Sequence, residues 1–232
     1  MRAARLSALL LLLTLPGLAL AARPLVTDDA RIVDAKACQL ETWIKRHGGT
    51  LEYWAMPACT PVDNVEITAG GALAWERGGE AGRRFDSALL QFKTLLRPFD
   101  ERTWGMGLVA GALGHPYETS DLLGSFYTYA PISLALAPDI ALHLNPGWLY
   151  ERNSDRRALT WGAGGEVGLT PHIQWIGETY GEEGDGNYYQ AGFRFWVVPE
   201  HVQIDTTYGN RFGGGESFWT FGLRLISLPF LP

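Results

Sequence analysis

The residues best suited to chemistry in this sequence are His143 and Asn145, which stand two apart in a segment of alternating apolar and polar residues. Positions i and i+2 of a strand face the same way, so both side chains would project from one face of a sheet. Outer-membrane lipid hydrolases place a His and a Ser in this relation, and the His activates the Ser as a nucleophile. Asn cannot replace that Ser. We therefore expect a hydrogen-bonded His rather than a catalytic one, and a lipid hydrolase is the last of the alternatives.

Sequence motifs of other enzyme classes are also missing. The chain has no G-x-S-x-G, H-E-x-x-H, P-loop or C-x-x-C motif, and its five His residues are scattered. Asp28-Asp29 could bind a cation, although a paired acidic turn is more often simply solvated. The sequence thus predicts no enzyme, no catalytic residue, no metal site and no cofactor, and it leaves the role of Asp28-Asp29 open.

A larger set of polar and charged residues shares one face of the alternating segments, opposite the apolar residues. The candidates for an inner, lumen-lining face are Glu41, Lys45, Glu52, Lys93, His143, Asn145, Glu166, Glu178, Arg194, Asp205 and Arg224, together with Glu66, Gln91, Gln174 and Gln203. Charges inside a narrow barrel must pair with one another or line water. The first arrangement would plug the barrel, and the second would form a polar path or a ligand site.

One hairpin can be aligned by counting. A two-residue turn at Gly48-Gly49 is typical of tight hairpins. It sets Lys45 opposite Glu52, Trp43 opposite Trp54 and Cys38 opposite Cys59. Opposite charges, an aromatic pair and the only two cysteines agree on one register, and cross-strand neighbours of this kind stabilise a sheet. Since exported compartments permit disulfides, we predict a Cys38–Cys59 disulfide near the periplasmic rim.

A second hairpin concerns buried charges. A turn at Pro199-Glu200 sets Arg194 opposite Asp205 and Val197 opposite Val202. Glu178 has the same polarity on the preceding strand, so we expect Arg194 to serve both carboxylates. Around residues 169–172 the same counting puts Glu166 opposite an apolar residue, which predicts a three-residue turn or a bulge there.

These residues need strands to position them, and the chain contains about twelve such segments. The predicted strands are 37–46, 50–59, 65–75, 85–97, 104–113, 124–134, 140–150, 158–169, 173–180, 187–198, 201–208 and 218–226. Most have alternating apolar and polar residues, which indicates strands with two different faces. The 28 Gly and the many Trp, Tyr and Phe residues disfavour helices and favour pleated surfaces.

The connections between these segments alternate in length. Those at 77–84, 114–121, 151–157, 181–186 and 209–217 are long and polar, whereas those at 60–64, 98–102, 135–139, 170–172 and 199–200 are tight. Long outer loops and short periplasmic turns are typical of outer-membrane barrels. The short connection at Gly48-Gly49 departs from this pattern.

The first residues indicate export. Arg2 and Arg5 precede an apolar run over residues 6–20, and Ala19-Leu20-Ala21 is a small-residue cleavage site. This order is that of a secretory signal peptide. We therefore divide the chain into a signal peptide (1–21), a periplasmic N-terminal segment (22–36) and the barrel (37–232). Loss of both arginines moves the formal net charge from −6 to −8, which argues against nucleic acid as a partner.

Short motifs at both ends of the mature chain carry a family resemblance. They are RPLVTDDA at 23–30, CQLETW at 38–43, ETYG at 178–181, QAGFRFW at 190–196 and VQID at 202–205. In these motifs the chain resembles the outer-membrane proteins of the "MetA-pathway of phenol degradation" family. The resemblance implies an outer-membrane barrel and the uptake of small hydrophobic or aromatic compounds, and it implies no catalytic residue.

Together these observations predict an all-β chain, an antiparallel transmembrane β-barrel in the outer membrane of a Gram-negative-type cell. The leading function is a channel or transporter for small, hydrophobic or aromatic molecules, with outer-membrane lipid as its surroundings. A plugged structural or interaction barrel without transport is the first alternative, and a membrane-embedded lipid hydrolase is the second. The sequence names neither the solute nor the oligomeric state.

Overall fold

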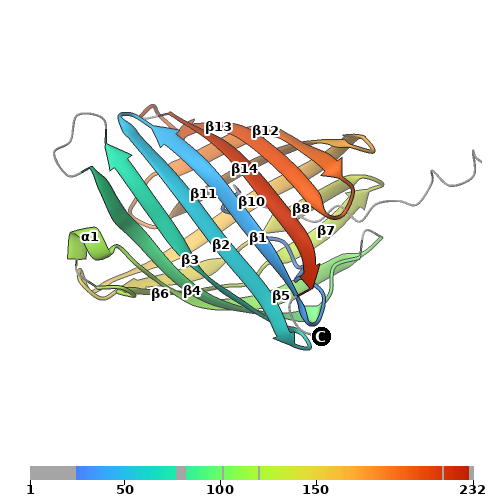
Figure 1. Ribbon diagram of the computed structural model, residues 1–232, viewed down its shortest axis with the longest axis horizontal. Helices are drawn as coiled ribbons and strands as arrows, with labels where there is room; N and C mark the ends of the chain where they lie inside the picture. Colours follow the sequence, from blue (N-terminus) through green and yellow to red (C-terminus); the bar gives the residue numbers. More distant parts are fainter. Residues whose placement is uncertain (1–24, 77–81, 101, 120, 216, 230–232) are drawn as a thin grey trace, which may run out of the picture.

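The strands of the chain form one antiparallel sheet that closes on itself into a barrel (Figure 1). The computed structural model describes residues 25–76, 82–100, 102–119, 121–215 and 217–229, so the predicted signal peptide lies outside the described residues. The strands are β1 (Ala37–His47), β2 (Thr50–Val62), β3 (Val65–Glu76), β4 (Arg83–Arg97), β5 (Trp104–Gly114), β6 (Ser125–Tyr129), β7 (Ile132–Ala137), β8 (Ile140–Leu144), β9 (Gly147–Glu151), β10 (Arg156–Thr170), β11 (Ile173–Glu182), β12 (Asn187–Val198), β13 (Val202–Arg211) and β14 (Phe218–Pro229). The ring is completed where β14 pairs with β1 and β10 pairs with β11.

Four of these strands are halves of two longer ones. β6 and β7 both pair with β5, and β8 and β9 both pair with β10. The breaks fall at Pro131 and Pro146, because proline has no N–H to donate to the ladder. A hydrogen bond of 3.0 Å from Ala130 N–H to the Pro146 carbonyl holds the two breaks side by side. When each broken strand is counted once, the barrel has twelve strands. This confirms the predicted fold and strand number.

The two ends of the barrel differ in their connections (Figure 1). One end, which we call the turn end, holds the start of β1, the end of β14 and tight connections such as β2–β3 and β12–β13. The other, the loop end, holds the longer connections, and the β5–β6 connection there includes the short helix α1 (Pro116–Thr119). In outer-membrane barrels the short turns face the periplasm.

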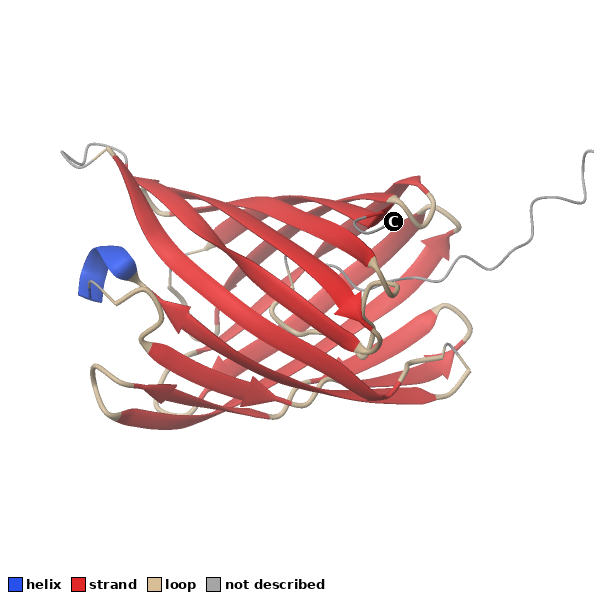
Figure 2. Ribbon diagram, turned by 60° about the horizontal axis from the view of Figure 1, so that its bottom comes forward, coloured by secondary structure: helices blue, strands red, loops and turns tan. Residues whose placement is uncertain are grey.

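The strands wrap around one axis and form a single wall (Figure 2). Apolar side chains cover the outside of this wall and polar ones line the inside. On β4, Phe92 is 47% exposed, while its neighbours Gln91 and Lys93 are 3% and 4% exposed. A soluble barrel would reverse this arrangement, because water favours polar groups outside. The apolar residues of the alternating strands therefore face outwards and the polar ones inwards, as in a transmembrane barrel.

The register at the first hairpin follows the counting. Cys38 pairs with Cys59, Trp43 with Trp54 and Lys45 with Glu52. The Cys38–Cys59 disulfide is confirmed, with the two Cα atoms 4.0 Å apart. The cysteines alternate with the buried Gln39 and Glu41 along β1, so they belong to the outward-facing side of the wall.

Bulges occur beside the two other turns whose registers were predicted. Arg194 pairs with Asp205 as expected, but a bulge after Trp196 sets Val198, not Val197, opposite Val202. That pairing prediction was wrong because the turn counting assumed no extra residue. At the β10–β11 turn the register shifts between Gly168 and Thr170, which confirms the expected bulge.

The N-terminal segment, residues 25–36, runs inside the barrel. It adds no strand to the sheet, in keeping with its separation from the predicted barrel strands. However, Leu25, Ala30 and Val33 are buried, and the segment bonds to β3, β7 and β11. The periplasmic position expected for residues 22–36 must therefore be corrected for the described part: its apolar side chains and backbone groups are satisfied by the barrel interior.

Candidate functional site: the barrel lumen

All eleven lumen candidates from the sequence lie on the inward-facing side of their strands or of the strand break at Pro146. The structure brings nine of them into contact with the N-terminal segment or with one another around it. Lys45 and Glu52 stand apart, nearer the loop end of the first hairpin. Glu52 binds His47 and Trp54, while Lys45 lies over the ring of Phe218.

The deepest part of the N-terminal segment is held by Glu178 of β11. The carboxylate of Glu178 accepts the backbone N–H groups of Val26 at 2.8 Å and Thr27 at 2.6 Å, and the side-chain amide of Gln190 at 2.5 Å. A carboxylate is a strong acceptor for backbone N–H groups. Glu178 therefore fixes the depth to which the segment reaches.

The wall opposite Thr27 is made of glycine. A Cβ atom placed on Gly162 of β10 would lie 2.7 Å from the Thr27 hydroxyl oxygen, and one on Gly164 would lie 3.2 Å from the Thr27 Cβ atom. The inward face of β10 thus leaves a hollow that the Thr27 side chain fills. We call Gly162 and Gly164 the glycine seat.

The middle of the segment is held through Asp28. Its carboxylate accepts from Lys93 at 2.9 Å and from the Tyr129 hydroxyl at 2.9 Å. With the amide of Asn145 oriented to satisfy both of its ends, this side chain donates to the Asp28 carbonyl at 2.9 Å and accepts the Asp28 N–H at 2.6 Å. Three side chains of the barrel, Lys93, Tyr129 and Asn145, therefore converge on Asp28.

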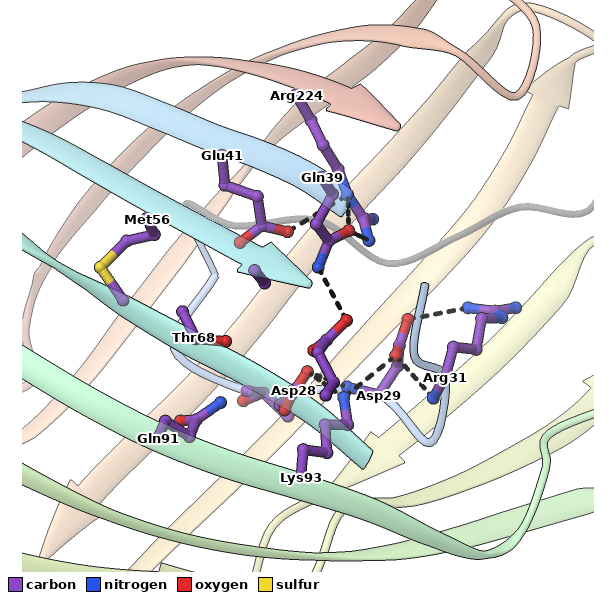
Figure 3. Close-up of a pocket in the computed structure, with 13 residues that line it drawn as sticks. Asp28, Asp29, Arg31, Gln39, Glu41, Met56, Thr68, Gln91, Lys93 and Arg224 are labelled. Atoms are coloured by element: carbon purple, nitrogen blue, oxygen red, sulfur yellow. Dashed lines mark hydrogen bonds and ion pairs between the residues drawn. The ribbon is translucent and has the colours of Figure 1, made fainter. Parts of the chain in front are cut away.

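Asp29 lies beside Asp28 among cations. It forms an ion pair with Arg31 at 3.0 Å and lies 3.7 Å from Lys93 (Figure 3). Burial acts to raise the pKa of Asp29, but Arg31 and Lys93 outweigh it and hold this pKa below its ordinary value. The two aspartates, whose role the sequence left open, thus serve as anionic anchors of the segment.

A second network joins strands to one another around Arg194 of β12, and it reaches the N-terminal segment where Glu166 lies 3.9 Å from Arg31. The Arg194 guanidinium donates to Asp205 at 2.9 Å and to Glu166 at 2.5 Å, and Gln203 donates to Asp205 at 3.0 Å. We call these four residues the Arg194 network. The prediction that Glu178 would be the second carboxylate on Arg194 was wrong. Gln174 is the β11 residue opposite Arg194, whereas Glu178 lies opposite Gln190, four residues away.

His143 has a serine partner that the sequence reading missed. The Ser133 hydroxyl lies 2.8 Å from His143 Nδ1, and His143 Nε2 lies 3.9 Å from Glu166. A Ser, a His and a carboxylate in a row suggest a nucleophile, but Ser133 is fully buried and its oxygen accepts the Ala30 N–H at 2.8 Å. The arrangement therefore anchors the N-terminal segment.

Towards the turn end the segment is tied down by Glu66, which accepts the Val33 N–H at 3.0 Å. Gln39 links Glu66 to Arg224, and Arg224 pairs with Glu41 at 3.2 Å (Figure 3). A polar cavity of only about 30 Å³ remains between these side chains and the segment. That volume suits one or two water molecules.

On the loop-end side of the segment the lumen opens into a cavity of about 420 Å³, which we call the vestibule. Val26 and Thr27 line it together with Leu113, Tyr127, Tyr129, Asn145, Leu149, Thr160, Trp161, Gly162, Tyr180, Gly181, Glu182, Asp185, Gly186 and Tyr188. Tyr180 and Tyr188 stack with ring centroids 5.5 Å apart, and Tyr127 and Tyr129 stack at 6.1 Å. The volume lies within the range of about 300–1,000 Å³ found for small-molecule sites.

The charged groups of the vestibule are paired. Glu182 forms an ion pair with Arg156, and Asp185 lies 3.6 Å from Arg211. Carboxylates engaged in this way offer little attraction to a charged solute. The vestibule therefore has aromatic walls, paired charges and a floor made by the tip of the N-terminal segment.

The vestibule tyrosines were not among the sequence candidates, because those candidates were restricted to polar and charged residues. The alternation along β12 could have identified the inward-facing tyrosines. Tyr188 lies an even number of residues from Gln190 and Arg194 and so faces inwards with them. Tyr189 lies an even number of residues from Phe193 and Phe195 and faces outwards with those two. Among the described residues, no group of three or more metal-ligating side chains occurs. In the same part of the chain, no helix is long and apolar enough to cross a membrane.

A family model described as "Uncharacterised conserved protein UCP029691" matches residues 9–225. The chain belongs to this family. No curated protein matches this UCP029691 member significantly. The matching family is not the one that the short motifs at both ends of the mature chain resemble, and the similar structures support that resemblance only at the level of an outer-membrane barrel.

Solved structures with similar folds are outer-membrane barrels at very low sequence identity. The KdgM porin in complex with disordered oligogalacturonate has a TM-score of 0.62 and 7% identity, over 81% of this chain and 98% of that one. The NanC porin has a TM-score of 0.59 and 8% identity, over 83% and 100%. An outer membrane channel from Pseudomonas putida F1 has a TM-score of 0.56 and 12% identity, over 86% and 97%. The UCP029691 member thus has the fold of outer-membrane β-barrel channels, and this fold locates it in the outer membrane.

Proposed function

We propose that this protein is an outer-membrane channel that takes up small, uncharged hydrophobic or aromatic molecules through the vestibule. The observation that carries the proposal is the aromatic cavity of about 420 Å³ at the loop end. Aromatic side chains bind flat rings by offset or edge-to-face contacts. The apolar outer wall is matched to outer-membrane lipid, which we propose as its surroundings.

The proposal excludes acidic solutes such as the one named with KdgM. Each basic side chain of the central lumen already contacts a carboxylate: Lys93 contacts Asp28, Arg194 contacts Asp205, and Arg224 contacts Glu41. An anionic solute would have to break one of these buried pairs, which is costly. A neutral solute requires no such exchange.

Binding can be tested by titrating the purified protein in detergent with p-cresol and with its charged analogue p-hydroxybenzoate. Tyr188→Ala should weaken p-cresol binding, because it removes half of a stacked pair in the vestibule wall. Tyr189→Ala is the matched control, since its neighbouring ring lies on the outer wall against Phe212. Because p-cresol partitions into the detergent micelles equally for both variants, a difference between them reports binding to the protein. Equal p-cresol binding by the two variants, or stronger binding of p-hydroxybenzoate, would refute the proposal.

A plugged barrel without transport is the second candidate, and the N-terminal segment favours it. Residues 25–33 bond to β3, β4, β7 and β11 across the lumen. Planar bilayers separate the two candidates: conductance steps that depend on the solute support a channel, and silence under all conditions supports a plug.

Lipid hydrolysis is not part of the proposed function, because Ser133 is buried beneath Ala30. We therefore propose that the protein is not an enzyme. Phospholipid turnover by the purified protein that disappears in His143→Ala would contradict this.

A further inference from the structure

The tip of the N-terminal segment separates two spaces inside the barrel. Thr27 lines both the vestibule and the small polar cavity beside the segment. Figure 3 shows Asp28, Asp29 and Arg31 crossing the lumen between strand-borne side chains on either side. Moving residues 25–31 aside would therefore join the vestibule to the turn end of the lumen.

The attachments of this tip are of a kind that can be exchanged. Glu178, Lys93, Asn145 and Ser133 hold it through side-chain hydrogen bonds and ion pairs. Among the described residues, the backbone–backbone bond between Phe99 and Ala30 is the one such bond made by residues 25–31. No ladder of sheet hydrogen bonds has to break for the tip to leave, within the described part of the chain.

The lower part of the segment is fixed by a separate set of contacts. The Val33 N–H donates to Glu66, the Val33 carbonyl accepts from Thr60 at 3.0 Å, and the Lys36 N–H donates to the Thr60 carbonyl at 2.8 Å. Lys36 has a positive φ of 62°, which turns the chain into β1. These contacts form an anchor about which the tip can swing.

We propose that residues 25–31 are a gate, displaced from the lumen by a small neutral ring compound that carries a hydroxyl or amino group. The proposal rests on the function proposed above. The ring occupies the vestibule between the tyrosine pairs, with Val26 and Thr27 as its floor. Its donor group replaces the two backbone N–H groups at Glu178, so that this buried carboxylate keeps hydrogen-bond donors when the tip leaves.

The donor decides the chemistry of the solute. A ligand shifts an equilibrium only by its difference in affinity between the two states. An apolar ring fills the vestibule in either state, but only a solute with a donor compensates Glu178 in the open state. When the tip leaves, Glu178 keeps only the Gln190 amide among its described donors, and the loss of two donors to a buried carboxylate is unfavourable. We therefore expect p-cresol to open the channel and p-xylene, in which a methyl group replaces the hydroxyl, to bind without opening it.

The gate can be locked by a disulfide. A Cβ atom on Gly162 would lie 3.4 Å from the Thr27 Cβ atom, close to the separation that a disulfide bridges. In planar bilayers, the oxidised Thr27→Cys/Gly162→Cys protein should be silent with p-cresol, and reduction should restore the conductance. The two single variants and the parent protein, treated with the same oxidant and reductant, are the controls. Equal conductance of the oxidised and reduced double variant would overturn the gate.

A second variant keeps the inference testable if the locked protein does not fold. Glu178→Gln should raise the open probability without solute roughly tenfold, the effect of weakening hydrogen bonds to a charged group. Glu52→Gln is the control, because Glu52 binds His47 and Trp54 away from the segment. Opening can also be read from maleimide labelling of Ala30→Cys, since Ala30 is fully buried in the closed barrel.

The outcomes distinguish this inference from the proposed function. Binding of p-cresol without conductance or labelling overturns the gate and leaves the binding site standing. Opening of Glu178→Gln with no p-cresol binding in titrations supports a movable segment but overturns the proposed function and the solute trigger. Equal opening by p-cresol and p-xylene overturns the role of the donor.

Discussion

Two buried carboxylates on neighbouring strands have different kinds of partner. Glu166 of β10 binds the guanidinium of Arg194 on β12, so it ties one part of the wall to another. Glu178 of β11 binds the backbone N–H groups of Val26 and Thr27, which belong to no strand. Both side chains are almost completely buried, so burial does not distinguish them. The nearest partner does distinguish them: Glu166 binds Arg194 of the wall and lies 3.9 Å from Arg31 of the tip, whereas Glu178 binds the backbone of the tip directly.

The largest effect is expected in the wall. Arg194→Ala removes the cation shared by Asp205 and Glu166 and leaves both carboxylates in a closed interior. Loss of one partner of a buried pair costs about 3–5 kcal/mol. Asp205→Ala should cost less, since Arg194 keeps Glu166. Unfolding midpoints and heat-modifiable gel mobility measure both variants.

The double variant Arg194→Ala/Asp205→Ala provides the internal check. It should recover part of the loss, because one stranded carboxylate has been removed, and a double-mutant cycle gives the coupling free energy. Strictly additive losses would mean that Arg194 and Asp205 are not in contact and that the β12–β13 register is wrong.

The same substitution at the two carboxylates should separate stability from gating. Glu166→Gln weakens a charged pair and should lower the free energy of unfolding by about 1.5–3 kcal/mol. Glu178→Gln replaces a charged acceptor of backbone N–H groups by a neutral one and should lower it by about 1 kcal/mol. Labelling of Ala30→Cys should rise more for Glu178→Gln. Equal labelling in the two backgrounds would remove the distinction between wall and gate.

A smaller effect is expected at the glycine seat. Gly164→Ala places a methyl group 3.2 Å from the Thr27 Cβ atom, so the tip must shift slightly. The free energy of unfolding should change by only about 0.5 kcal/mol, while labelling of Ala30→Cys increases. Gly165→Ala is the control, because its nearest neighbour, the Ala141 carbonyl, lies at an ordinary 3.5 Å. The comparison fails if both variants label alike.

The smallest effect concerns ions. The buried strand-borne charges of the lumen are the carboxylates Glu41, Glu66, Glu166, Glu178 and Asp205 and the cations Lys93, Arg194 and Arg224. Carboxylates therefore outnumber cations on the strands. When the tip leaves, Asp28, Asp29 and Arg31 leave the lumen with it, and the excess of strand-borne carboxylates remains. Fixed charge of one sign attracts counter-ions into a pore. Reversal potentials of the open channel should therefore show weak cation selectivity, and anion selectivity would contradict the open-lumen composition.

Local patterns predicted much of the wall. The strands follow from period two, and the first hairpin follows from a two-residue turn, because both depend on residues close in sequence. The breaks at Pro131 and Pro146 were not foreseen. Each removes a single N–H from the ladder, and the pairing resumes on the far side with the same neighbouring strand. The bulge after Trp196 was missed for a similar reason, since it adds a residue without changing the alternation nearby.

The lumen could be predicted only in part. Alternation assigned Glu166, Glu178 and Arg194 to the inner face, but the height of each residue along the barrel depends on the stagger of its strand. That stagger places Gln174 rather than Glu178 opposite Arg194. Ser133 was missed because it reaches His143 from the neighbouring half-strand rather than from the same strand.

The sequence by itself determined strands with one apolar and one polar face and a disulfide across the first hairpin, because the alternation and the two-residue turn depend on residues close together in the chain. Only the tertiary structure decided what fills the lumen. The contacts of the N-terminal segment join residues far apart in the chain, such as Thr27 with Glu178 and Ala30 with Ser133. No period in residues 22–36 encodes those partners. They exist because the closed barrel brings distant strands around one short segment, whose buried backbone groups must find donors and acceptors there.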